Sequence, residues 1–155
     1  MGVFVGIDVS LENSAVCAVD EHGKLLKETK VASDPGALNA CIRSMPGVVE
    51  AIGIEAGPLS QWLHKSLTDL GLPVVLMETR QVKAALKAAP VKTDRRDAAG
   101  LARLLQMGWF RPVHCKSLSA QELRVLLGAR RSVQEAAINI EMSIRGMLRN
   151  FGLRL

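Results

Sequence analysis

The stretch Val-Phe-Val-Gly-Ile-Asp-Val at residues 3–9 decides the predicted fold, because it is an apolar run of strand length that carries an acidic residue near its end. Residues 14–19 and 24–31 also have strand character, and the turn sequence Asp-Glu-His-Gly at residues 20–23 joins them as a hairpin. The N-terminal part of the chain therefore predicts a three-stranded antiparallel meander.

Strands and helices are expected to alternate after this meander. Ser33 or Asp34 is placed to cap a helix that has Pro35 in its first turn. The predicted elements are a helix to about Met45, strands at 48–55 and 73–77, and helices at 60–70, 80–89 and 94–107. This order predicts an α/β fold with a mixed five-stranded sheet flanked by helices, which is the pattern of a ribonuclease H-like domain.

The sequence changes character after Pro112. Ser-Ala-Gln-Glu at residues 119–122 is a capping box that predicts the start of a long helix. Apolar residues then recur at alternating spacings of four and three, which indicates the seam of a coiled coil or a helix hairpin. The residues of this seam are Val133, Ala137, Ile140, Ile144, Met147 and Phe151.

The charge of the chain is concentrated at its C-terminal end. The formal net charge is +5; residues 1–110 carry 12 basic and 12 acidic side chains, whereas residues 111–155 carry 8 basic and 3 acidic ones. A basic segment on a neutral body favours a polyanionic partner, although a solvated helical face would have the same composition.

Composition also excludes several classes of protein. No apolar run approaches the roughly 20 residues that span a bilayer, and no signal peptide is recognisable, so we expect a soluble, cytoplasmic protein without a membrane partner. The 3 cysteines and 3 histidines are scattered without ligand spacing, which argues against disulfides and zinc.

Four carboxylates are the candidate site. Asp8 and Glu55 each close a short apolar strand, and Asp94 and Asp97 lie three residues apart, on one face of a predicted helix. Two magnesium ions can stabilise the attacking and leaving oxygens of a phosphodiester transfer, and such ions require oxygen ligands on rigid elements. The set therefore predicts a magnesium site, in which manganese could substitute.

Other interpretations of these residues stay open. Asp94 and Asp97 could cap a helix or form exposed ion pairs with their arginine neighbours, and Asp8 or Glu55 could simply belong to turns. The Gly-Ile-Asp sequence at residues 6–8 also opens actin-like sugar kinases and chaperones, but their phosphate turn is rich in glycine and threonine. Here Ser-Leu-Glu-Asn follows at residues 10–13, which disfavours ATP binding.

Four segments carry a family resemblance over roughly residues 3–115. They are Gly-Ile-Asp-Val-Ser at 6–10, Ile-Glu-Ala-Gly-Pro at 54–58, residues 75–82, and Lys-Thr-Asp-Arg-Arg-Asp-Ala at 92–98 with Leu101 and Ala102. The chain resembles the amino-terminal domain of the DEDD transposases of bacterial insertion sequences, which include the Piv-type DNA invertases. The resemblance implies a fold similar to that of Holliday-junction resolvases (RuvC-like), with Asp8, Glu55, Asp94 and Asp97 as catalytic magnesium ligands.

The resemblance also implies partners and a domain plan. It implies a structured bridge RNA that pairs with donor and target DNA, and a homodimer or tetramer, for which the C-terminal helix offers the seam. A second domain supplies a serine nucleophile in such proteins, and we expect that domain to be missing here. The expected plan is a DEDD catalytic domain at 1–112 and a basic helical linker segment at 113–155.

The leading hypothesis is the metal-binding catalytic part of a DNA transposase. Basic residues near the carboxylates are expected to contact phosphates of DNA or guide RNA. These residues are Arg80, Lys83, Lys87, Lys92, Arg95 and Arg96. The alternatives are a stand-alone nuclease of the Holliday-junction type and a non-catalytic module for nucleic-acid binding or dimerisation.

Overall fold

The computed structural model describes residues 1–87 and 94–153, except that the side chains of Asp94 and Arg95 are not described. The chain divides into two compact units, Met1–Cys115 and Lys116–Leu155. The first unit contains β1 (Gly2–Asp8), β2 (Asn13–Asp20), β3 (Leu25–Ala32), α1 (Pro35–Arg43), β4 (Val48–Glu55), α2 (Ser60–Asp69), β5 (Val74–Met77), α3 (Thr79–Leu86) and α4 (Asp94–Gln106). The second unit contains α5 (Leu118–Arg149).

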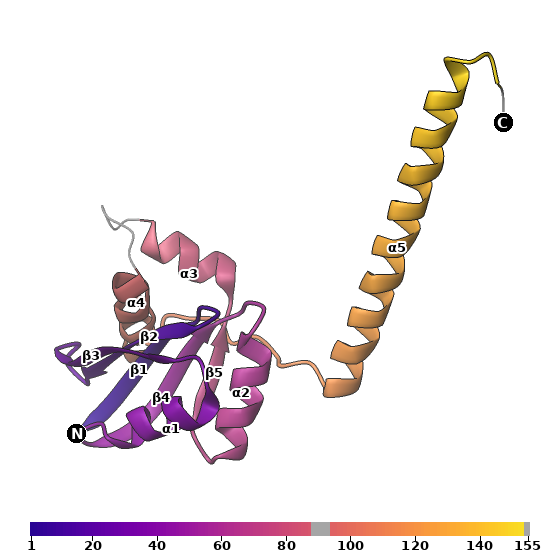
Figure 1. Ribbon diagram of the computed structural model, residues 1–155. Helices are drawn as coiled ribbons and strands as arrows, with labels where there is room; N and C mark the ends of the chain where they lie inside the picture. The colour runs from indigo at the N-terminus through magenta and orange to yellow at the C-terminus, as the bar shows by residue number, and fades with distance from the viewer. Residues whose placement is uncertain (88–93, 154–155) are drawn as a thin grey trace. The chain divides into compact units, whose positions relative to one another are not determined.

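The five strands form one mixed sheet in the order β3-β2-β1-β4-β5 (Figure 1). β1, β2 and β3 pair antiparallel, as the predicted meander requires, whereas β4 pairs parallel with both β1 and β5. The carboxyl ends of β1, β4 and β5 therefore meet on one side of the sheet. We call this side the carboxyl edge and define it by the residues Asp8, Glu55 and Glu78.

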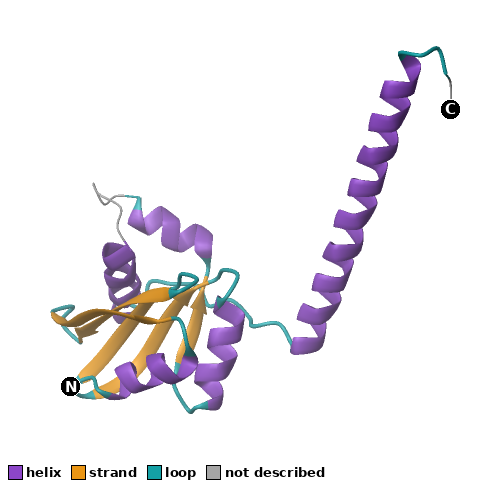
Figure 2. Cartoon of the chain, viewed as in Figure 1, coloured by secondary structure: helices purple, strands orange, loops and turns teal. Residues whose placement is uncertain are grey.

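Helices cover both faces of the sheet (Figure 2). On one face, Val3, Val5 and Ile7 of β1 pack in a core that also contains Leu38 of α1 and Leu63 of α2. On the opposite face, Ala15, Cys17 and Val19 of β2 and the partly buried Phe4 pack against α4. A strand that is buried on both faces of the sheet must be apolar throughout. This explains why β1 is a continuous run of apolar residues rather than an alternation of apolar and polar ones.

The predicted fold class is confirmed, and the start of the long helix is corrected. Asp34 caps α1 by accepting a hydrogen bond from the backbone N of Ala37, as expected. The predicted N-cap at residue 119, however, lies two residues after the N-cap in the structure. α5 begins at Leu118, and Ser117 is its N-cap, because the Ser117 hydroxyl accepts from the backbone N of Ala120.

The three cysteines of the chain are reduced. None of Cys17, Cys41 and Cys115 takes part in a disulfide. Burial, assisted by the nearby negative charge of Glu28, raises the pKa of the Cys17 thiol to about 11, so this thiol stays protonated at neutral pH.

No helix among the described residues has both the length and the apolar character that crossing a membrane would require.

Two glycines let α4 approach the centre of the sheet. A Cβ atom at Gly6 of β1 would collide with the backbone carbonyl oxygen of Ala98 and the backbone nitrogen of Ala102. A Cβ atom at Gly53 of β4 would lie 2.7 Å from both Leu105 Cδ1 and Met77 Sδ. Because the obstacle at Gly6 is backbone, a side chain there would displace the whole helix.

We expect Gly6→Ala to lower the free energy of unfolding by about 3 kcal/mol, because overpacking against helix backbone cannot be relieved by a side-chain rotation. Denaturant unfolding measures the effect. Gly57→Ala is the matched control in the same unit, since the nearest atom to its added Cβ, the Glu55 carbonyl oxygen, lies 3.9 Å away. Equal stability of the two variants would contradict the close packing of α4 on β1.

Candidate metal and nucleic-acid site

Asp8 and Glu55 end two adjacent parallel strands. The last paired residues of β1 and β4 are Ile7 and Ile54, so the two carboxylates follow at equivalent positions of neighbouring strands. Asp8 is also paired with Ala15 of β2, which fixes its backbone from the other side. Both side chains are half-buried, which places them at the surface of a rigid sheet rather than on a loop.

Helix α4 runs antiparallel to β1, and its first turn lies toward the carboxyl edge. At its C-terminal end, Gln106 Nε2 donates to the Glu21 carbonyl oxygen, and the Glu21 carboxylate accepts from the backbone N of Gly2 at the start of β1. Ala98 and Ala102 lie over Gly6, near the end of β1. Asp97, which is half-buried, thus lies in the turn of α4 nearest to Asp8.

The structure places some of the predicted acidic residues toward the same side of the sheet. Asp8, Glu55 and Asp97 share the carboxyl edge, and Asp94 is the first residue of α4, although its side chain lies outside the described part. Among the described residues, no three Asp, Glu, His or Cys side chains gather closely enough to hold a metal ion. The carboxylate oxygens are nevertheless the donor type that magnesium prefers.

Glu78 is an acidic residue at the same edge that sequence reasoning missed. It follows Met77 of β5, and Met77 is paired with Glu55. The backbone N of Glu78 donates to the Arg111 carbonyl oxygen, and its half-buried side chain makes no capping hydrogen bond to α3. The signal was present, because Val-Val-Leu-Met-Glu at residues 74–78 is also an apolar strand that closes on a carboxylate.

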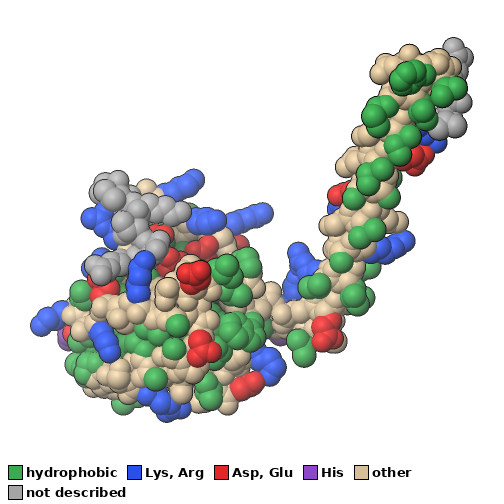
Figure 3. Space-filling model, in the orientation of Figure 1, with side chains coloured by type: hydrophobic (Ala, Val, Ile, Leu, Met, Phe, Trp, Pro, Cys, Tyr) green, Lys and Arg blue, Asp and Glu red, His purple; other side chains and the backbone are tan. Residues whose placement is uncertain are grey.

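The predicted basic residues fall into two groups. Arg80 and Lys83 of α3, Lys87 at its C-terminal end and Arg96 of α4 are exposed. Lys92 and the side chain of Arg95 lie outside the described residues. In Figure 3, Lys and Arg side chains border a group of Asp and Glu side chains on the visible face of the first unit. Cations beside carboxylates are the arrangement expected where a phosphate backbone meets a metal site.

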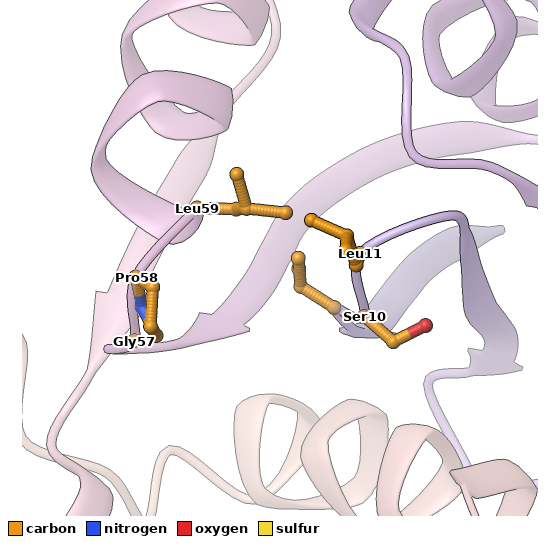
Figure 4. Close-up of a pocket in the computed structure, with 6 residues that line it drawn as sticks. Ser10, Leu11, Gly57, Pro58 and Leu59 are labelled. Carbon is orange, nitrogen blue, oxygen red and sulfur yellow. The ribbon is translucent and has the colours of Figure 1, made fainter.

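A small pocket opens beside the carboxyl edge (Figure 4). It lies between the loop that follows β1 and the loop that follows β4, and its volume is about 210 Å³. The residues that line it are Val9, Ser10, Leu11, Gly57, Pro58 and Leu59. The pocket therefore begins one residue after Asp8 and two residues after Glu55.

Comparison with solved structures shows the fold. The structure of Thermus thermophilus RuvC matches with a TM-score of 0.50 and 21% identity, over 72% of this chain and 99% of that chain. The T. thermophilus RuvC in complex with Holliday junction substrate matches with a TM-score of 0.51 and 21% identity, over 73% and 100%. The first unit is therefore RuvC-like, as the family resemblance implied.

Comparison with sequences shows the family. The transposase for insertion sequence element IS1111A of Coxiella burnetii is 26% identical over 157 residues, which cover 97% of this chain and 40% of that relative. This chain thus spans less than half the length of that relative. The transposase family DEDD_Tnp_IS110 matches residues 5–152. The chain therefore belongs to the IS110 family of DEDD transposases.

Proposed function

We propose that the carboxyl edge is the metal-dependent catalytic site of a DNA transposase that cuts and rejoins DNA at donor and target ends. The observation that carries the proposal is the placement of Asp8 and Glu55 on adjacent parallel strands, with the first turn of α4 at the same edge. Asp8, Glu55, Asp94 and Asp97 would hold magnesium. The bound ion would supply positive charge to the attacking and leaving oxygens of a phosphodiester.

The protein's own residues orient the site. The paired strands fix Asp8 and Glu55, and the glycine contact at Gly6 sets how closely α4 brings Asp97 to them. Rigid backbone on three elements limits reorganisation when ligands bind. Two similarities support DNA as the substrate: the Coxiella relative is a transposase, and the structural neighbour was solved in complex with a Holliday junction.

We extend the proposal to the nucleic-acid partners. The exposed cations of α3 and α4 would contact phosphates, which gives affinity without reading sequence. A structured guide RNA would then supply the sequence recognition by base pairing. The serine nucleophile implied by the family resemblance would come from another domain, so residues 1–115 would contribute metal and phosphate binding to the reaction.

A nuclease that cuts branched DNA by itself is the second candidate. It is favoured by the structural neighbour that was solved with a Holliday junction. It would need the carboxylates alone, without a serine. Cleavage of a synthetic four-way junction by this chain in magnesium would favour this candidate over the transposase site, and its absence would favour the composite site.

We also propose that α5 forms a homodimer or tetramer through its apolar seam. None of the residues of α5 is buried, and Val133, Ile140, Ile144 and Met147 are 69%, 61%, 45% and 59% exposed. Arg131 pairs with Glu135, and Arg145 pairs with Glu141. Phe151, the last residue of the predicted seam, lies beyond the end of the helix. Exposing a row of apolar side chains to water along a 32-residue helix is unfavourable in free energy unless a partner covers them.

The metal proposal is tested by calorimetric titration of manganese. Asp8→Asn with Glu55→Gln removes two ligand charges, so we expect manganese affinity to fall at least about tenfold, which corresponds to about 1.4 kcal/mol. Glu12→Gln is the matched control, since it removes one charge from an exposed position in the turn that follows Asp8. Equal affinity of the double variant and the wild type would refute a metal site at these carboxylates.

The proposed seam is tested by light scattering on the full chain. Ile140→Asp with Ile144→Asp places charges within the apolar contact, so we expect the mass to fall to that of a monomer. Asn139→Asp adds the same charge one residue outside the seam and should leave the mass unchanged. An assembly that persists in the double variant, or a monomeric wild type, would rule out the seam.

A further inference from the structure

The pocket beside the carboxyl edge is lined mainly by apolar side chains. Leu11 and Leu59 point toward each other across it, with Gly57 and Pro58 on one side (Figure 4). Leu11 is 82% exposed, so its side chain contributes little to the core. A leucine that is exposed beside a pocket is available to contact a molecule bound there.

Hydrogen bonds hold both loops of the pocket in place. The Ser10 hydroxyl donates to the Asn13 carbonyl oxygen, and the Ser33 hydroxyl donates to the Ser10 carbonyl oxygen. On the other side, the Ser60 hydroxyl accepts from the backbone N of Gly57 and donates to the Gly57 carbonyl oxygen. The pocket is therefore preformed, as binding sites usually are.

These same bonds leave the pocket with few free polar groups. The hydroxyl of Ser10 and both backbone groups of Gly57 already have partners within their own loops. The remaining walls are the aliphatic side chains of Val9, Leu11, Pro58 and Leu59. Such a pocket can select a flat apolar face by shape, but it cannot read a pattern of donors and acceptors.

Size and position restrict the occupant. Its volume of about 210 Å³ is smaller than the roughly 300–1,000 Å³ of sites for drug-sized ligands. The walls of the pocket begin one residue after Asp8 and two residues after Glu55. Because consecutive Cα atoms lie about 3.8 Å apart, the distance from a phosphate held at the carboxylates to the pocket is about the length of one nucleotide. The group attached to that phosphate is a nucleoside.

We propose that this pocket binds the unstacked nucleobase next to the scissile phosphate of DNA, by apolar contact and without reading its sequence. The inference rests on the proposed function, because the phosphate at the carboxylates is what brings the base within reach. Leu11 and Leu59 would clamp the two faces of the base. Pairing with the guide would then carry the sequence recognition, since this pocket tolerates any base that fits.

The test compares two DNA strands by fluorescence anisotropy with magnesium present. One strand is a short oligothymidylate, and the other is an abasic deoxyribose-phosphate strand of equal length and charge. We expect the wild type to bind the oligothymidylate roughly tenfold more tightly, and Leu11→Ala to reduce this preference to near unity while its affinity for the abasic strand stays unchanged.

Leu25→Ala is the matched control. Leu25 is 51% exposed and begins β3, which is paired at that point with Val19 rather than with the loops of the pocket. This variant should keep the full preference for the base-containing strand. Both substitutions remove exposed leucine side chains, so neither should prevent folding.

Methyl NMR of the wild type gives a second readout at the level of single residues. Addition of the oligothymidylate should shift the methyl signals of Val9, Leu11 and Leu59, whereas the abasic strand should leave them in place. If both strands bind with equal affinity and leave these methyl signals unmoved, the base pocket is refuted while phosphate binding at the site survives. If neither strand binds, the proposed function fails, and the pocket's role fails with it.

Discussion

The close approach of α4 to β1 at Gly6 is the contact on which the arrangement of the site depends. No side chain fits between the Gly6 backbone and the carbonyl oxygen of Ala98, so the helix lies directly on the central strand. This contact brings the first turn of α4, with Asp97, to the end of β1 that carries Asp8. A helix held farther from the sheet would keep the fold but separate its acidic residues.

Parallel pairing supplies the second constraint. Because β1, β4 and β5 run in the same direction, every side chain that follows one of them emerges at the same edge. Asp8, Glu55 and Glu78 share that edge for this reason. The loops that continue from β1 and β4 form the pocket, so the strand pairing that places these carboxylates at one edge also places an apolar surface beside that edge.

Much of the fold could be predicted from local patterns. Each of these patterns depends only on residues close in sequence: the apolar strands, the Asp34 cap and the turn at Gly23. The order of the predicted elements indicated the mixed sheet. The family was predicted from short motifs and is confirmed by the match of the transposase family over residues 5–152. Helix ends were harder, because Ser117 and Ser119 are both competent caps and only the backbone distinguishes them. Glu78 was missed although the apolar run at residues 74–77 precedes it in the same way as the runs that precede Asp8 and Glu55.

The pocket could not be predicted, since its walls come from loops that are far apart in sequence and meet only through the pairing of β1 with β4. The proposed function requires that a metal ion binds at the carboxyl edge. Anomalous diffraction from crystals grown with manganese tests it most directly. A peak within about 2.0–2.3 Å of Asp8 and Glu55 carboxylate oxygens, beside the first turn of α4, is predicted. A peak away from these residues, or none at saturating manganese, would contradict it.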